Sequence, residues 1–161
     1  MDTKIKDILN NAEYYTDSEK CLLKIMKKKL SIDKIKEILD LENKLIAGAF
    51  LTKYQHFDDN DLKYMEQYIL DNLDHENKMF VSDLIEFATC WELQLPYRKC
   101  IEFLTVHKED NTYVQLSAID YIFENLKFSY ILEIVKALQE ILDSKEMNNS
   151  LNPIVQMAQE R

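Results

Sequence analysis

Residues 111–143 read NTYVQLSAIDYIFENLKFSYILEIVKALQEILD. Apolar residues recur in this stretch every three or four positions, which is the spacing of helices that bury one face. Asn111 and Ser129 precede the two periodic runs, and both residue types favour the amino-terminal caps of helices. The stretch therefore predicts two helices, 111–125 and 129–143, folded back on each other as a hairpin.

The same pattern occurs twice more, earlier in the chain. The predicted helix pairs are 43–56 with 60–73, and 77–93 with 97–107. A step of 34 residues relates equivalent positions, namely Asn43, Asn77 and Asn111, then Leu51, Ile85 and Ile119, then Leu70, Leu104 and Leu138. A fixed period of this length is typical of stacked repeats, in which no repeat buries its apolar face without a neighbour. We therefore expect three hairpins with one continuous core.

The third copy resembles a HEAT-type repeat. NTYVQLSAIDYIFENL has a capped polar turn followed by Val114, Ala118 and Ile119 at the spacing of that family's first helix, and a second helix rich in Leu and Ile follows. The resemblance covers roughly residues 43–143. It implies a right-handed α-α superhelix whose second helices line a concave surface, and it brings no catalytic residues with it.

The composition also predicts an all-α protein. One glycine and two prolines in 161 residues leave little material for the tight turns of β-hairpins. At 47% hydrophobic and 30% charged residues, the chain is typical of a folded globular domain. We predict a single domain over 1–161, with amino-terminal capping helices in 1–42, the hairpins in 43–143 and a carboxy-terminal capping helix in 150–161.

Cellular location and redox state follow from two further patterns. No apolar run is long enough to cross a membrane, and MDTKIKDILNNAEYY at the start carries charges in every turn, unlike a secretory signal peptide. We therefore expect a cytoplasmic protein that does not bind membranes. Cys21, Cys90 and Cys100 are spaced for neither a zinc site nor a disulfide framework, and we expect buried thiols.

The net charge of −9 is unevenly distributed along the chain. Residues 1–36 carry nine lysines and six acids, whereas residues 37–161 carry eleven lysines and arginines and twenty-three acids. The basic region Lys20–Lys36 fits either a patch for nucleic acid or anionic lipid, or a solvated helix end where the helix dipole favours cations. We favour the solvated helix end, because the acidic remainder of the chain repels phosphate.

The sequence lacks the common motifs of enzymes. Nucleophile elbows, phosphate loops and dinucleotide-binding motifs require glycines that the chain does not have. His56, His75 and His107 lie beside acids at predicted helix ends, without the spacing that builds a metal site on one helix, so we expect solvated or capping histidines. DDND at 58–61 lacks the glycine and the distal glutamate of a calcium loop. We predict no enzymatic activity, no metal and no cofactor.

The predicted second helices present a set of exposed positions. On helix 60–73 the apolar stripe leaves Tyr64, Tyr68 and Asp71 on a neighbouring face. The 34-residue step extends this set to a ladder on the concave surface: Tyr64, Tyr68, Asp71, Arg98, Glu102, Thr105, Leu132, Lys136 and Gln139. Tyr and Arg dominate the binding energy of many protein interfaces. The two tyrosines fit equally well as a cover for the edge of their hairpin, so both interpretations stay open.

An acidic body with such a surface suits a basic protein partner, because complementary charge raises the association rate and sets specificity. We predict a module that presents carboxylates in place of phosphates to a cationic cleft: Asp58, Asp59, Asp61, Asp71, Asp74 and Glu76. In size and charge the chain is similar to small bacterial immunity proteins and antitoxins that block a toxin, often a nuclease.

Two alternatives belong to other functional classes. One is a scaffold subunit that binds its partner through Lys20–Lys36. The other is a HEAT-repeat enzyme on nucleic acid, of the DNA glycosylase kind, which would need a cationic groove. The chain has only two arginines, Arg98 and Arg161, and we expect no direct binding to nucleic acid.

Overall fold

The computed structural model describes residues 1–11, 15–105 and 112–143, and the regular structure in these residues is entirely helical. The all-α prediction is therefore confirmed. The chain divides into two compact units, Met1–Asp71 (unit 1) and Asn72–Arg161 (unit 2). None of the helices in the described ranges combines the length and the apolar character that crossing a bilayer requires.

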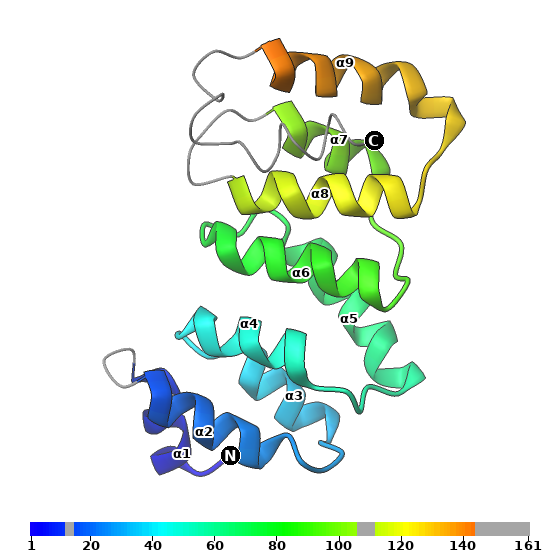
Figure 1. Cartoon of the computed structure of the whole chain (residues 1–161). Coiled ribbons are helices and arrows are strands. Elements are labelled where there is room, and N and C mark those ends of the chain that lie inside the picture. Colours follow the sequence, from blue (N-terminus) through cyan, green and yellow to red (C-terminus); the bar gives the residue numbers. More distant parts are fainter. Residues whose placement is uncertain (12–14, 106–111, 144–161) are drawn as a thin grey trace. The chain divides into compact units, whose positions relative to one another are not determined.

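Unit 1 is built around α4. Its helices are α1 (Thr3–Asn10), α2 (Tyr15–Ile25), α3 (Ile32–Leu39), α4 (Lys44–Lys53) and α5 (Asp59–Asn72) (Figure 1). Helices α2 and α3 both pack on α4, and α1 packs on α2. The fully buried side chains of this unit include Leu22, Ile35, Ile38, Ile46, Phe50 and Tyr54.

Unit 2 contains two helical hairpins that pack on each other. Its elements are α6 (Lys78–Cys90), α7 (Tyr97–Thr105), α8 (Thr112–Glu124), the short 3₁₀ helix η3 (Phe128–Tyr130) and α9 (Ile131–Asp143) (Figure 1). Helix α8 packs on α6 and α7, and α9 packs on α7. The two first helices, α6 and α8, are thus neighbours, and so are the two second helices, α7 and α9. This is the arrangement that stacked hairpins require.

The predicted helix positions are largely confirmed, and the capping residues explain why. Ser31 Oγ accepts the N–H of Lys34 at 3.3 Å, and Asn77 Oδ1 accepts the N–H of Phe80 at 3.1 Å, so both cap their helices as expected. Asn43 precedes α4 without a side-chain capping bond, and its amide instead donates to Leu9 O. Ser129 lies inside η3, so α9 begins two residues later than predicted. The predicted cap Asn111 and helix 150–161 lie outside the described residues.

The 34-residue step predicts burial for the first helices but not for the second helices. Leu51 in unit 1 and Ile85 and Ile119 in unit 2 are all buried. On the second helices, Leu104 is buried whereas Leu70 is 41% exposed. The step therefore predicts burial at these positions of the first helices, whereas burial on each second helix depends on the neighbours of that helix.

A tyrosine contact recurs in both units. Tyr54, which follows α4, accepts the backbone N–H of Leu30 through its hydroxyl oxygen at 2.8 Å, and Leu30 directly precedes the cap of α3. Tyr121 on α8 accepts the N–H of Leu95 at 2.8 Å, directly before Pro96 and α7. In each unit a buried tyrosine thus fixes the turn of the preceding hairpin. This recurrence shows that α2 and α3 are held by α4 as α6 and α7 are held by α8. The single domain and the right-handed superhelix stay predictions.

Candidate functional site

Two of the ladder positions in unit 2 line one groove. Because α7 and α9 lie side by side, their facing side chains enclose an open hollow of about 220 Å³. We call it the α7–α9 groove, and its lining is Ile101 and Thr105 from α7 with Glu133, Lys136, Ala137 and Glu140 from α9. Two predicted ladder residues, Thr105 and Lys136, therefore share one groove. Glu102 is exposed on α7 without belonging to its lining.

The α7–α9 groove has an apolar floor and a charged rim. Ile101 and Ala137 are buried, whereas Lys136 and Glu140 are exposed. Arg98 Nη1 donates to Glu133 Oε2 at 3.1 Å, and the Arg98 guanidinium also lies over the ring of Tyr130 at 5.4 Å. Both partners of this ion pair are solvent-exposed, so the pair orients Arg98 more than it stabilises the fold.

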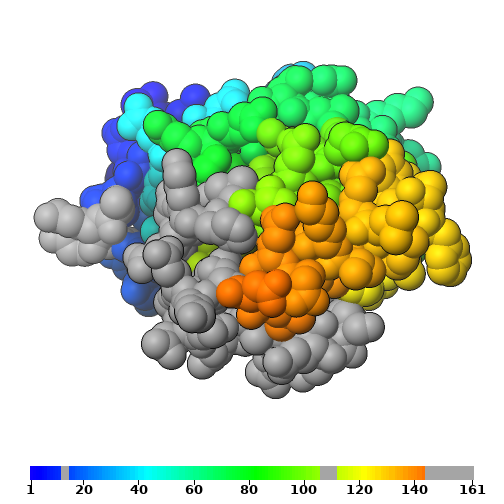
Figure 2. All heavy atoms as spheres, turned by 90° about the horizontal axis from the view of Figure 1, so that it is seen from above, coloured from blue at the N-terminus to red at the C-terminus, as the bar shows by residue number. Residues whose placement is uncertain are grey.

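The two most exposed apolar side chains of the described residues, Phe128 in η3 and Leu132 in α9, lie away from the packed face of α9, and the exposed Val135 lies on the same side as Leu132. Phe128 and Leu132 are each 82% exposed and Val135 is 55% exposed. We call these three residues the outer α9 face. In the space-filling view, the atoms of α9 (amber to orange) form part of the surface turned toward the viewer (Figure 2). Helix α9 thus has two faces with apolar side chains, and within the described part of the chain only the inner face, with Ile134, Ala137 and Ile141, is buried.

The repeat step shows what kind of surface the outer α9 face is. The position 34 residues before Val135 is Ile101, and the position 34 residues before Ile131 is Tyr97. Ile101 and Tyr97 are buried on α7, which α8 and α9 cover. Val135 and Ile131 correspond to this packing surface but are exposed. Within the outer α9 face, Val135 therefore corresponds to a helix-packing position, whereas Phe128 and Leu132 correspond to the exposed Gln94 and Arg98. The predicted ladder includes Leu132 but neither Phe128 nor Val135.

The tyrosines of the first hairpin are packed within unit 1. Tyr68 donates its hydroxyl proton to Leu39 O at 3.2 Å, and the Lys36 ammonium lies 4.9 Å from the centre of the Tyr64 ring. Burial raises the pKa of both phenols. Both rings therefore contact α3, which is the geometry of a hairpin-edge cover. Their role in partner binding stays a prediction.

The six carboxylates predicted to face a partner differ in their environments. Asp61 is buried, bonds to the Lys29 ammonium and accepts the N–H of Asp58, so it belongs to the internal structure of unit 1. Asp58 accepts the N–H of Asp61 at 2.9 Å, and this bond together with Lys29 lowers the pKa of Asp58. The reciprocal Asp58–Asp61 bonds form a capping box at the start of α5. Asp59 is exposed beside them.

The other three predicted carboxylates lie near the end of α5 and in the turn that follows it. Asp71 is exposed and accepts a bond from the Gln67 amide at 2.8 Å. Asp74 pairs with the Lys99 ammonium at 2.6 Å, and this contact lowers its pKa. Glu76 is exposed. Asp59, Asp71 and Glu76 are thus the carboxylates of the predicted set that are exposed and not held by a lysine.

The histidines and cysteines differ in their environments. His75 Nδ1 accepts the N–H of Asn77 at 2.9 Å, His56 is exposed, and His107 lies outside the described residues. In the described ranges no three His, Cys, Asp or Glu side chains come together as a metal site would need. The prediction of buried thiols is confirmed for Cys100 but wrong for Cys90, which is exposed, while Cys21 is half-buried.

Comparison of the chain with known protein families, with curated proteins and with solved structures found no match.

Proposed function

We propose that this chain is a non-enzymatic module that binds another protein through the outer α9 face and the adjoining α7–α9 groove. The main observation in support of this proposal is that Phe128, Leu132 and Val135 are all exposed within eight consecutive residues. Scattered exposed apolar side chains are ordinary, whereas a contiguous group marks a surface that a partner covers. Burying such side chains contributes about 1.5–3 kcal/mol each to association before the entropy of binding is subtracted.

Charge supports a basic partner. The exposed ionised side chains of α7, α9 and the residues before η3 include more acids than bases: Glu102, Glu124, Glu133, Glu140 and Asp143 against Arg98, Lys127 and Lys136. Two of the bases already have contacts, since Arg98 pairs with Glu133 and the Lys127 ammonium lies over the ring of Tyr97. The net charge of −9 would attract a cationic protein over a longer range.

The acidic charge and the exposed apolar side chains also support a role as an inhibitor of the partner. An anionic surface with exposed apolar side chains can block the phosphate-binding cleft of a cationic enzyme, because its carboxylates occupy the positions that the phosphates of the substrate would take. Asp59, Asp71 and Glu76 are exposed and would add to the negative electrostatic potential of the chain. We therefore propose an inhibitor of the immunity-protein or antitoxin kind, built as a HEAT-like stack of hairpins.

The test is capture of the partner by three forms of the chain, namely wild type, Leu132→Asp and Leu45→Asp. Leu45 on α4 is 55% exposed, so Leu45→Asp makes the same chemical change on a different surface. Each form is immobilised and incubated with extract of the source cells at physiological salt. We expect a basic protein that wild type and Leu45→Asp retain, that Leu132→Asp loses at least tenfold, and that elutes as salt is raised.

The purified partner then tests inhibition directly. If it cleaves nucleic acid, an equimolar amount of wild type should stop the cleavage, and Leu132→Asp should require a large excess. Equal capture by all three forms, or an acidic partner, would contradict the proposal.

A further inference from the structure

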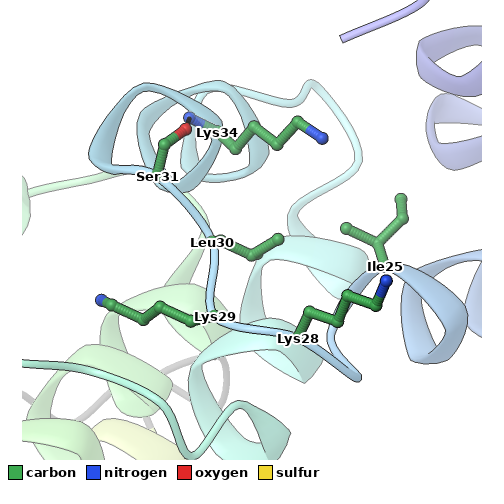
Figure 3. Close-up of a pocket in the computed structure, with 6 residues that line it drawn as sticks. All are labelled: Ile25, Lys28, Lys29, Leu30, Ser31 and Lys34. Carbon is green, nitrogen blue, oxygen red and sulfur yellow. Dashed lines mark hydrogen bonds between the residues drawn. The ribbon is translucent and has the colours of Figure 1, made fainter.

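A basic hollow lies at the turn between α2 and α3 in unit 1. It has a volume of about 340 Å³, and it is lined by Ile25, Lys28, Lys29, Leu30, Ser31 and Lys34 (Figure 3). The function proposed above uses unit 2 and leaves this hollow unexplained.

The turn that forms the hollow is held in place by α4 and α5. The Leu30 N–H donates to the buried hydroxyl of Tyr54 at 2.8 Å. The Lys29 ammonium pairs with Asp58 Oδ2 at 3.2 Å and with the buried Asp61 carboxylate. The Tyr54 bond holds the backbone of the turn and the ion pairs hold the Lys29 side chain, so the residues that line the hollow project from an anchored turn. A preorganised site loses less entropy on binding.

Lys28 and Lys34 differ from Lys29 in having no acidic partner. Figure 3 shows the Lys29 side chain extending to one side of the turn, while Lys28 and Lys34 extend to the other side, where Ile25 and Leu30 also lie. Among the described residues, no carboxylate pairs with the ammonium of Lys28 or of Lys34, although the chain has 29 acids and 20 bases. Two unpaired cations at one hollow repel each other, and an anion between them would remove that repulsion.

The remaining lining supplies a hydroxyl and an apolar wall. Ser31 Oγ accepts the N–H of Lys34 at 3.3 Å, and its own hydroxyl proton is left to donate. Leu30 is buried and Ile25 is half-buried, so an apolar group next to the anion would contact carbon rather than water.

We propose that this hollow binds the phosphate group of a small phosphomonoester, with Lys28 and Lys34 neutralising its charge and Ser31 donating a hydrogen bond. A phosphate carries up to two charges and three terminal oxygens, which two ammonium groups and one hydroxyl can engage together. A carboxylate has one charge and two oxygens, and leaves one of the three donors unused. An extended polyanion fits less well, because residues 37–161 carry 23 acids against 11 bases and would repel it.

The experiment follows backbone amide signals by NMR while inorganic phosphate is added to the full chain. Sodium chloride and sodium acetate are added in parallel at the same ionic strength. We expect saturable shifts of amides in residues 28–34 with phosphate alone. In the Lys28→Ala/Lys34→Ala variant, binding should weaken at least tenfold.

The matched control is Lys4→Ala/Lys63→Ala, which removes the same charge from exposed positions of unit 1 outside the hollow. It should bind phosphate within twofold of wild type. Equal weakening in both variants would show general electrostatic attraction and overturn the proposal. Shifts with acetate as large as those with phosphate, or shifts located elsewhere in the chain, would overturn it as well.

Discussion

Tyr121→Phe removes one hydroxyl from the interior of unit 2 and leaves the ring in place. Tyr121 is fully buried, and its hydroxyl oxygen accepts the Leu95 N–H at 2.8 Å. Leu95 is 6% exposed, so water cannot readily replace the lost acceptor. The net value of a buried hydrogen bond is about 1 kcal/mol, and an unsatisfied buried donor costs about 1–3 kcal/mol. We expect the free energy of unfolding to fall by about 2 kcal/mol. The substitution creates no large cavity, because the aromatic ring remains in place.

Urea unfolding measured by tryptophan fluorescence is the assay. Trp91 is the single tryptophan, it follows α6 directly, and it therefore reports on unit 2. With a slope of about 2 kcal/mol per M urea, the midpoint should fall by about 1 M. The control is Tyr113→Phe on the same helix, where the tyrosine is 54% exposed and the midpoint should stay unchanged. A Tyr121→Phe midpoint equal to that of wild type would refute the view that this bond holds the α6–α7 turn.

Three further predictions concern single residues. Burial, and to a lesser degree the charge of Glu86, raises the pKa of Asp83 to about 6, above the ordinary value of 3.8. The folded state then binds this proton more tightly than the unfolded state, so the free energy of unfolding falls as pH rises from about 4 to 6. Asp83→Asn should remove this pH dependence and raise the free energy of unfolding at pH 7 by about 1–3 kcal/mol, which urea titrations at several pH values can measure. A thiol reagent should label the exposed Cys90 in the folded chain but Cys100 only after unfolding, because Cys100 is buried and burial raises the pKa of its thiol to about 12. Peptide mass spectrometry can identify the labelled cysteine. Leu132→Asp should change the free energy of unfolding by less than about 0.5 kcal/mol, since its side chain is 82% exposed, and a larger loss would mean that this side chain supports the fold.

The sequence predicts those features of the fold that local patterns encode. Ser31 and Asn77 are capping residues at the start of apolar periods, and both cap the expected helices. Leu51, Ile85 and Ile119 are buried because each lies on the inner face of a first helix, a position that helical periodicity identifies without knowledge of neighbours.

Contacts between distant residues were not predictable in this way. Asp61 looks like one more surface acid in DDND, yet it is buried because Lys29 reaches it from 32 residues earlier in the chain. The two tyrosine contacts join residues 24 and 26 positions apart, and no local period indicates them. Specific tertiary partners decide the burial of polar groups, and spacing within one helix contains little information about them.

The candidate site was only partly predictable for the same reason. Thr105 and Lys136 were predicted to share a surface, and they line one groove because α7 and α9 pack side by side. The exposure of Phe128 and Val135 was not predicted, because both residues fit the apolar pattern of a packed helix. Their exposure depends on which element follows in the stack, and this is a property of the assembled unit rather than of the local sequence.

The central claim is that a protein partner covers the outer α9 face. The most direct measurement is amide hydrogen exchange of the full chain with and without the captured partner. The account predicts slower exchange in residues 128–140 and in α7, while α2 and α3 exchange at unchanged rates. Protection of Lys20–Lys36 with unchanged exchange in α9 would contradict the account and would favour a scaffold that binds through its basic region.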